Sequence, residues 1–353
     1  MVRLADLLGN KGKPPEEPSK PTPPLAAAPP ASTPPRVPPV IPQRRVSSLS
    51  AGKPLTSLPP IVEALYAQLI LCVRDLFAQA RAGNPLQLTE ADQLIQQLPK
   101  LASGQYDDIL ILDEQRPEDH YLVSHCVHVA FLAHHLALCL GYTEATAHQL
   151  ALAGLVIDIG MAGKMEELAE APRQLTREEK RIIEQHPVNA IALLRKSQEL
   201  SQEALGAITS HHLRPDGSGY PKEAQSATAI EYSKILAVAD VYDAMTHPRS
   251  YRKPMNPAIA MKSLIGGVGD QFDRRVVKVL VDELSLYPRG SAVKLNTGEL
   301  AVVQRVNPGA ALRPLVLIHR DADRNAVVPA RLVNLAQNPL IAIKEVLAVE
   351  DRS

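Results

Sequence analysis

Prolines divide this chain into two unlike parts. Sixteen of its 31 prolines lie between Pro14 and Pro60, a stretch that contains no aromatic residue. A segment of this composition cannot bury enough apolar surface to offset the entropy that it loses on ordering. We therefore expect residues 1–60 to form a disordered, Pro-rich tether and the folded part to begin near Ile61.

The remainder has a composition that favours helices. Hydrophobic residues make up 45% of the chain, but aromatic residues make up only 3% and Trp is absent, so Leu, Ile, Val and Ala must build the core. The stretch "IVEALYAQLILCVRDLFAQA" gives the clearest amphipathic pattern in a helical region that we place at 61–118. Thr143 and Thr176 suit helix N-caps, and Gly141 suits a helix C-terminus. Beyond residue 118 the pattern predicts helices at roughly 119–140, 143–158, 176–197, 201–212, 228–246, 256–265 and 272–284.

The hydrophobic pattern of the sequence changes from helical to strand-like after Pro288. "SAVKLNTGELAVVQRV" predicts two strands joined at "NTGE", and "RPLVLIHR" predicts a third. The expected fold class is therefore mainly α, a helical bundle closed by a small C-terminal β module. We place the helical domain at 119–286 and the β-rich module at 287–353.

Charge, hydropathy and cysteine spacing bear on which partners and which compartment the protein has. The formal net charge is zero, so no overall field favours nucleic acid. The apolar runs "VAFLAHHLALCL" and "LALAGLVIDIG" are shorter than a bilayer span, which favours core helices and no membrane insertion. The three cysteines have no CxxC spacing, so we expect a reduced, cytoplasmic protein. A homodimer is compatible with the sequence.

Histidines and two carboxylates mark the candidate site. Ten of the eleven histidines lie between His120 and His247. Asp158 ends the apolar run "AGLVIDIG", and Asp240 ends "SKILAVAD". A carboxylate at such a place needs a partner, and imidazoles together with carboxylates suit Fe, Mn, Zn or Ni. The alternative is that the histidines are structural, since an adjacent pair at a helix C-terminus is also favoured by the helix dipole.

The stretch "HHLRPDGSGYP" resembles the signature HHExxDGxGYP of HD-GYP domains, the bacterial cyclic-di-GMP phosphodiesterases of the HD phosphohydrolase superfamily. "HCVHVA", "QHPVNAIALL" and "ADVYDAMTHPRSYRKP" are similar to further elements of that family, in the same order. The resemblance covers roughly residues 119–286, and the β segment is similar to a tail that often follows such domains. It implies an HD-superfamily helical bundle in a bacterial signalling protein.

The resemblance also implies a role for individual residues. Its metal ligands, commonly for iron or manganese, fall on His125, Asp158, His186, His211, His212 and Asp240, with Asp158 bridging as the central catalytic carboxylate. The residues that meet the dinucleotide in the family fall on Asp243, Arg249 and Arg252. The GYP loop consists of Asp216, Gly217, Gly219, Tyr220 and Pro221, which either shape a turn or dock a diguanylate cyclase (GGDEF) domain. We take His128, His134, His135, His148, His247 and His319 as structural or surface residues.

Four positions depart from the family pattern. Ile157 stands where the HD pair has its histidine ligand, and Met161 stands where the family has a lysine near the phosphate. Leu213 replaces the glutamate of the signature, and Tyr121 stands where some members carry an extra glutamate ligand. The resemblance then implies one firmly held ion rather than two, and weak or absent hydrolysis of cyclic di-GMP. Two alternatives stay open: a fully active phosphodiesterase, and a non-catalytic module that docks GGDEF-type partners.

Overall fold

The computed structural model describes residues 60–98, 121–171, 173–222, 226–247, 254–307, 310 and 312–347. Three expectations lie outside these residues: the tether up to residue 59, the helical pattern over 99–118, and the positions of Arg249 and Arg252.

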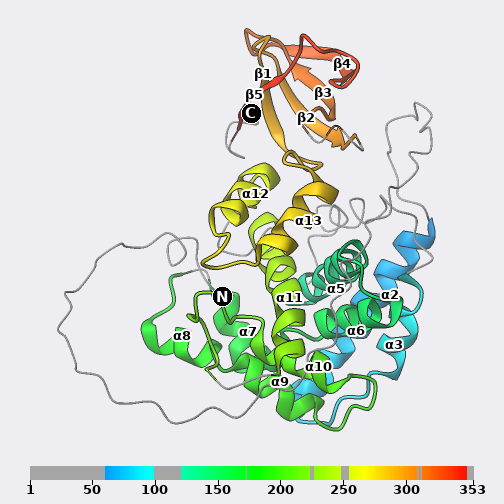
Figure 1. Ribbon diagram of the computed structural model, residues 1–353, viewed down its shortest axis with the longest axis vertical. Coiled ribbons are helices and arrows are strands. Elements are labelled where there is room, and N and C mark those ends of the chain that lie inside the picture. Colours follow the sequence, from blue (N-terminus) through cyan, green and yellow to red (C-terminus); the bar gives the residue numbers. More distant parts are fainter. Residues whose placement is uncertain are drawn as a thin grey trace, which may run out of the picture. The chain divides into compact units, whose positions relative to one another are not determined.

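Helices form most of the described chain, and one antiparallel sheet follows them (Figure 1). The helices are α2 (Pro60–Arg81), α3 (Thr89–Ile95), α5 (Tyr121–Cys139), α6 (Glu144–Leu155), the 3₁₀ helix η3 (Ile159–Met161), α7 (Lys164–Ala169), α8 (Arg177–Ile183), α9 (His186–Leu194), α10 (Gln202–Ser210), α11 (Ala227–Thr246), α12 (Pro257–Gly266) and α13 (Arg274–Leu284). The strands are β1 (Ala292–Leu295), β2 (Leu300–Arg305), β3 (Leu315–Arg320), β4 (Ala326–Asn334) and β5 (Ile343–Val346).

Helix α5 is the centre of the helical core. It contacts α2, α6, α11 and α13, and its side chains are buried along nearly the whole length from Leu122 to Ala137. A helix that is buried on all sides needs no polar face, which explains why its sequence is almost continuously apolar. By length and composition α5 passes as a membrane span, but 89% of its most apolar window is buried inside the protein, as in the core helix of a globular fold.

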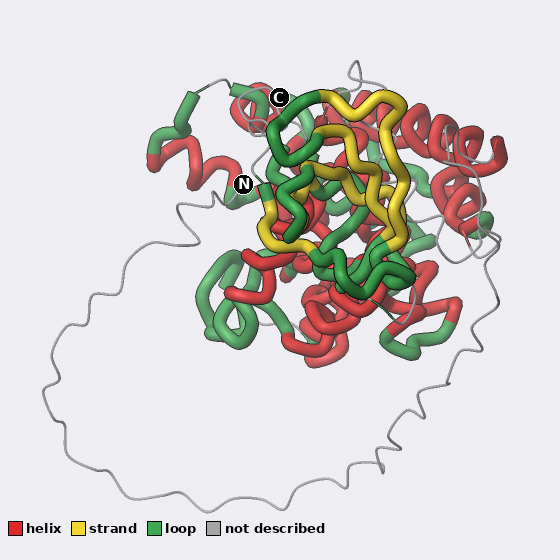
Figure 2. Tube along the Cα trace, turned by 90° about the horizontal axis from the view of Figure 1, so that it is seen from above, coloured by secondary structure: helices red, strands yellow, loops and turns green. Residues whose placement is uncertain are grey.

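The five strands lie together in one sheet (Figure 2). Their order is β4-β3-β2-β1-β5, and every neighbouring pair is antiparallel. Alternate residues of β1, β2 and β3 face a small apolar core that includes Val293, Ala301 and Val316. Asn256 connects this module to the helices. Its Oδ1 accepts from the backbone N–H of Ala258 at the start of α12, and its Nδ2 donates to the backbone carbonyl oxygens of Ala292 (3.0 Å) and Leu347 (2.6 Å).

Several local predictions from the sequence are confirmed. The Thr143 hydroxyl caps α6 by accepting from Thr146 N–H, and Thr176 caps α8 in a reciprocal arrangement with Glu179. Gly141 ends α5 with a positive φ of 86°. The three cysteines are free.

Other boundaries were predicted wrongly. The helix expected over 176–197 is two helices, because α8 ends at Ile183 and α9 starts afresh at His186 with Pro187 in its first turn. The helix expected to reach residue 158 ends at Leu155. Helix α7 and strands β4 and β5 were not predicted; β4 contains Pro329, which suits an edge strand.

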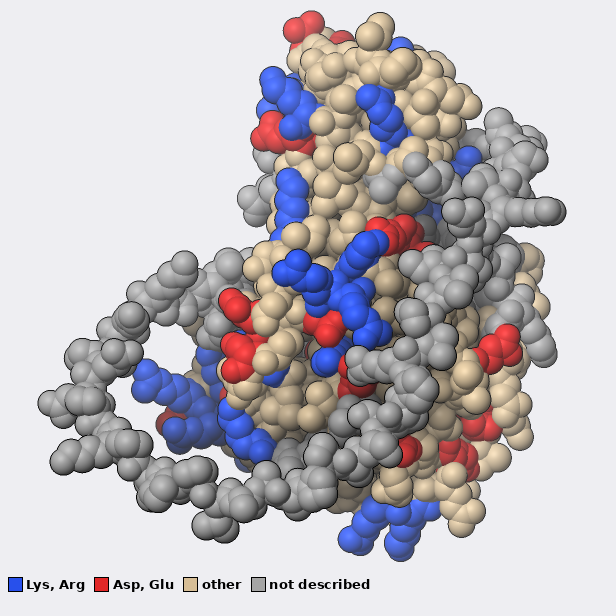
Figure 3. Space-filling view, in the orientation of Figure 1, with Lys and Arg blue, Asp and Glu red and all other residues tan. Residues whose placement is uncertain are grey.

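Charged side chains of both signs lie on one face of the molecule. On the face shown in Figure 3, Lys and Arg side chains lie among Asp and Glu side chains over the helical part. This mixture gives no support to a nucleic-acid surface on that face.

A close backbone approach holds η3 against α9. A Cβ atom on Gly160 would lie 2.0 Å from the carbonyl oxygen of His186 and 2.5 Å from the backbone nitrogen of Ala190. No flexible side chain can yield there, so the two segments carrying Asp158 and His186 can meet only through a glycine.

We predict that Gly160→Ala destabilises the chain by about 2 kcal/mol or more, because two backbone segments must separate. Thermal or denaturant unfolding measures this. Gly266→Ala is the matched control, since a Cβ atom there meets nothing within 4 Å, and its stability should be unchanged or slightly raised. Equal stability of Gly160→Ala and the wild type would contradict the predicted clash.

Candidate metal centre

Five segments bring the six predicted ligands together. His125 lies on α5, Asp158 follows α6 at the start of η3, and Asp240 lies on α11. The last three ligands are imidazoles: His186 begins α9, and His211 and His212 follow α10. Five of the six are buried, and the His212 side chain is only 11% exposed. A group of buried ionisable side chains of this size is stable only if its members neutralise one another or share a cation.

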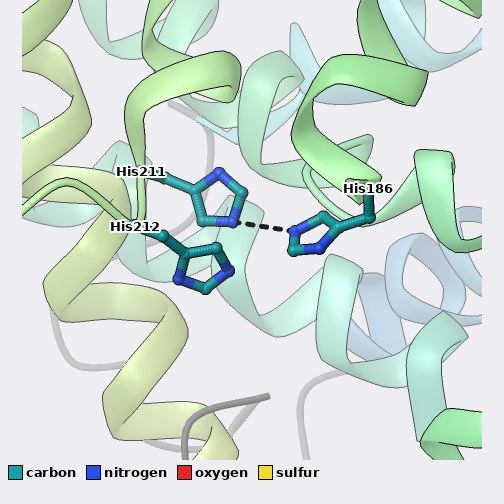
Figure 4. Close-up of side chains that lie close together, drawn as sticks. All are labelled: His186, His211 and His212. Carbon is teal, nitrogen blue, oxygen red and sulfur yellow. Dashed lines mark hydrogen bonds between the residues drawn. The ribbon is translucent and has the colours of Figure 1, made fainter. Parts of the chain in front are cut away.

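The three imidazoles face one another (Figure 4). Two of them are held by the backbone: His186 Nδ1 bonds to the carbonyl oxygen of Ile183 (2.8 Å), and His211 Nδ1 bonds to that of Ile208 (2.6 Å). Since a carbonyl oxygen only accepts, each Nδ1 carries the hydrogen and each Nε2 of a neutral ring presents a lone pair. The two Nε2 atoms lie 3.3 Å apart, and the His212 ring lies 3.9 Å from the His211 ring between centroids.

Two lone pairs that face each other at this distance need a cation between them. A proton on His186 would be one such charge, but burial holds the pKa of this imidazole well below its usual range and so opposes it. Ligand atoms of His186, His211 and His212 lie within 4.8 Å of one another. Imidazole nitrogens fixed by backbone carbonyls are a usual arrangement for transition-metal ligands, so these residues fit a divalent ion.

Asp158 connects this triplet to His125. Its Oδ1 lies 3.2 Å from His186 Nε2 and its Oδ2 lies 3.6 Å from His125 Nε2. Asp240 lies beside it, with Oδ1 3.1 Å from His125 Nε2 and Oδ2 3.9 Å from His212 Nδ1. Burial raises the pKa of Asp158, whereas for Asp240 burial is outweighed by the hydrogen bond and charge of His125, so the pKa of Asp240 is lowered.

His125 is surrounded by carboxylates. Burial alone would lower its pKa, but Asp240 and Asp243 outweigh burial and raise the pKa to about 10. An imidazolium at His125 therefore balances the nearby negative charge when no ion is bound. Ligation of a metal by Nε2 would require this nitrogen to lose its proton.

Asp243 lies on the other side of the His125 ring. Its Oδ2 is 2.7 Å from His125 Nδ1, and the residue is fully buried. Substrate contact by Asp243 stays a prediction; its buried position favours the orienting of His125, as carboxylates do behind metal-bound histidines. Arg249 and Arg252 lie outside the described residues.

The GYP loop is a tight turn against the imidazoles. Asp216 Oδ1 accepts from Ser218 N–H (2.8 Å), and Arg214 N–H donates to the Ser218 carbonyl oxygen (3.0 Å). Gly217 and Gly219 have positive φ angles of 79° and 93°, as the glycine pattern predicts. A Cβ atom on Gly219 would lie 2.0 Å from the His212 carbonyl oxygen.

Tyr220, next to Pro221, turns inward from this loop. Its ring lies 4.6 Å from the His212 ring and 6.3 Å from the His186 ring between centroids. The hydroxyl oxygen is buried and has no hydrogen-bond partner within the described part of the chain, and burial raises the pKa of Tyr220 well above its usual range. The sequence did not predict this, because a GYP turn alone does not tell which way its tyrosine points.

The positions that depart from the family pattern are apolar or aromatic here. Ile157 and Met161, on either side of the Asp158 turn, are buried. The Tyr121 ring stacks on His125 at 5.3 Å, with its hydroxyl oxygen 3.3 Å from His125 Nδ1. Leu213 forms an isolated antiparallel bridge with Gly219. The side chains at these positions therefore support the turn and the ring without adding an anionic or imidazole ligand.

Comparisons with known proteins agree with this architecture. A family model for the HD domain matches residues 85–276, more than half of the chain, and a model for the KOW domain associated with the HD domain matches residues 292–353. The chain belongs to the HD domain family and, within it, to the HD-GYP type. The first match overlaps the region 119–286 and begins earlier, at residue 85.

Similar curated proteins are phosphodiesterases. The chain is 29% identical over 274 residues to the cyclic di-GMP phosphodiesterase PA4108 of Pseudomonas aeruginosa, which covers 76% of this chain and 66% of that protein. It is 34% identical over 170 residues to the 3′3′-cGAMP-specific phosphodiesterase 1 of Vibrio cholerae, covering 47% and 39%. The solved structure of Bd1817, an HDG"Y"P protein from Bdellovibrio bacteriovorus, matches 63% of this chain and 70% of its own with a TM-score of 0.45 and 16% identity. The chain thus spans less than two thirds of the length of these curated relatives.

We predict that His211→Ala weakens binding of a divalent transition metal at least about tenfold, because it removes one nitrogen of the imidazole triplet. Titration of the metal-free protein with Mn²⁺ or Zn²⁺ measures this. His319→Ala, in strand β3, is the control and should bind as the wild type does. Unchanged affinity in a folded His211→Ala variant would contradict the assignment.

Proposed function

We propose that this chain is a cyclic-di-GMP signalling protein of HD-GYP type, a metal-dependent phosphodiesterase fold in which hydrolysis is weak or lost. The observation that carries the proposal is the group of His186, His211 and His212 joined to Asp158, in a chain of this family. The names of the relatives support a cyclic dinucleotide as the ligand. The ion would be iron or manganese, as in the family that the sequence resembles.

Each group of residues at the site would have its own role. A bound divalent ion would supply Lewis-acid polarisation of a phosphate and acidify a water molecule. Asp158 spans the imidazole triplet and His125, and its ionised form would hold positive charge between them. The buried Tyr220 hydroxyl, without a hydrogen-bond partner among the described residues, is available to a phosphate oxygen or to a water molecule. Arg249 and Arg252 would bind the phosphates through their paired N–H groups.

The same geometry explains why hydrolysis would be weak. The imidazole triplet and Asp158 offer four ligands for one ion. On the Nε2 side of His125 the carboxylates of Asp158 and Asp240 could share a second ion with it, but Ile157 cannot coordinate. Hydrolysis with two metal ions stabilises both the attacking and the leaving oxygen, and one ion gives up part of that stabilisation. Met161 likewise offers no positive charge to the phosphate.

We predict that Ile157→His combined with Met161→Lys raises the metal content by about one ion per chain and raises hydrolysis of cyclic di-GMP at least about tenfold. The restored imidazole would complete the ligands around His125, and the lysine would add a cation. Metal analysis and chromatography of the linear product measure the two effects. Assays with 3′3′-cGAMP in parallel test which dinucleotide is preferred.

Ile159→His is the matched control, since it places the same side chain on the same buried turn, and it should gain neither metal nor activity. The proposal of weakened hydrolysis is wrong if the wild type already binds two ions and turns over as fast as the double variant. That result would establish the fully active phosphodiesterase instead.

A docking role is the second candidate, because Asp216 and Gly217 are exposed at the tip of the GYP loop. If the chain acts only by docking a GGDEF domain, the metal-free protein and the His211→Ala variant would bind such a domain as strongly as the wild type. In that case cyclic di-GMP would not bind to the chain.

A further inference from the structure

A set of buried polar side chains lies behind His125. His128 follows one turn further along α5, Asp243 lies on α11, and His247 follows the last residue of α11. Tyr66, on α2, completes the set. None of these four residues is more than 4% exposed. The sequence predicted only structural roles for the two histidines, and the structure connects both of them to a predicted metal ligand.

Three imidazole nitrogens surround the carboxylate of Asp243. Its Oδ2 lies 2.7 Å from His125 Nδ1. Its Oδ1 lies 2.9 Å from His128 Nδ1 and 2.6 Å from His247 Nδ1. A carboxylate held at one oxygen can still turn about its Cβ–Cγ bond, but contacts at both oxygens fix its plane. The contacts at Oδ1 therefore help to determine where Oδ2 meets the His125 ring.

The two nitrogens of His125 have different partners. Nδ1 lies 2.7 Å from Asp243 Oδ2 and 3.3 Å from the Tyr121 hydroxyl oxygen, whereas Nε2 lies 3.1 Å from Asp240 Oδ1 in the candidate centre. Since a carboxylate only accepts, a neutral His125 ring that bonds to Asp243 has its hydrogen on Nδ1 and its lone pair on Nε2. This is the tautomer that a metal ligand requires when Nε2 is the donor atom.

Tyr66 extends the set to helix α2. Its hydroxyl oxygen lies 3.3 Å from His128 Nε2, and its ring is stacked on the His128 ring with 5.7 Å between centroids. When the hydrogen of a neutral His128 ring lies on Nδ1, toward Asp243, Nε2 accepts and the tyrosine hydroxyl donates. The match to the HD domain begins at residue 85. A residue outside the matched region therefore contacts the polar chain that ends at His125.

A purely structural role is the competing explanation, because a buried carboxylate needs partners whether or not a metal binds. Any arrangement in which Asp243 meets enough imidazoles would meet that need. The observed arrangement is more specific, since one oxygen contacts the predicted ligand His125 and the other oxygen contacts the remaining two histidines. A carboxylate that accepts from the second nitrogen of a ligating histidine sets the orientation of the ring and raises its basicity.

We propose that His128, His247 and Tyr66 are positioning residues for the candidate metal centre. By holding Asp243, they fix the His125 ring and the hydrogen on its Nδ1, so that Nε2 faces the ion. His128 and His247 act through Asp243, and Tyr66 acts through His128. This inference rests on the metal centre of the proposed function, and it adds α2 to the helices on which metal affinity depends.

Metal titration of the full-length chain with two similar-sized replacements at His128 tests the proposal. The side-chain amide of His128→Asn can still donate to Asp243, whereas His128→Leu has no donor. We expect His128→Leu to bind Mn²⁺ or Zn²⁺ about tenfold more weakly than the wild type, and His128→Asn to recover most of this affinity. A packing role predicts the reverse order, because a buried position favours Leu over an amide.

His134→Leu is the matched control, since His134 is a buried histidine of the same helix outside this set, and it should bind metal as the wild type does. A folded His128→Leu variant with the wild-type affinity overturns the proposal, and so does a His128→Asn variant that binds no better than His128→Leu. Because hydrolysis is not measured, either result would contradict this inference and leave the proposed function standing.

Tyr66→Phe keeps the test decisive if the changes at His128 prevent folding, because it keeps the ring and removes only the hydroxyl oxygen. NMR of ¹⁵N-labelled histidine observes the Nδ1 hydrogen of His125, and we expect its signal to broaden in Tyr66→Phe as the hydrogen exchanges faster. Tyr142→Phe is the control, since the Tyr142 hydroxyl bonds to Glu231 instead. An unchanged His125 signal in Tyr66→Phe contradicts the proposal. A wild type that binds no ion contradicts the proposed function, and this signal still tests the positioning role.

Discussion

Negative charge buried between helices is the constraint on which this structure depends. Asp158, Asp240 and Asp243 all lie in the core around His125, where an unpaired carboxylate would be very costly. Each one meets an imidazole nitrogen of His125 within 3.6 Å. The helices that carry them therefore cannot shift independently, and the positions of α5, α11 and η3 are coupled through one ring. Loss of any member leaves a buried charge that is uncompensated.

Much of the site could be predicted because its carboxylate and imidazole residues lie in short sequence motifs. The run "AGLVIDIG" places a carboxylate in an apolar environment, and "HH" followed by "DGSGYP" places two imidazoles before a tight turn. The structure brings His125, Asp158, His186, His211, His212 and Asp240 into one group, as the ordered motifs indicate. Helix caps such as Thr143 were equally predictable, since a cap depends on neighbours within one turn.

What the sequence did not reveal depends on contacts between distant segments. The break between α8 and α9 and the strands β4 and β5 are stabilised by packing that no local pattern reports. The inward turn of Tyr220 follows from the path of the loop over His212. The pairing of His128 with Asp243 joins residues 115 positions apart, as the difference between their numbers shows. The contact of His247 with Asp243 was easier to predict, because residues four apart on a helix lie on the same face.

The isoleucine at position 157, where the resemblance places a histidine ligand, can be understood through the same buried charges. An isoleucine at this turn is fully buried and leaves no polar atom without a partner, so the fold tolerates it. In the proposed site the cost falls on the carboxylates instead, because an ion between Asp158 and Asp240 would lack the imidazole ligand that the resemblance implies at position 157. When no ion is bound, His125, with its pKa raised to about 10, is protonated at neutral pH and supplies positive charge at that place. A protonated ring can thus stabilise the helical core where an ion would otherwise be needed, while it offers no Lewis acid to a phosphate. The stability of the core and catalysis thus place separate requirements on the same position, and a protonated His125 can meet the first of them when no ion is bound.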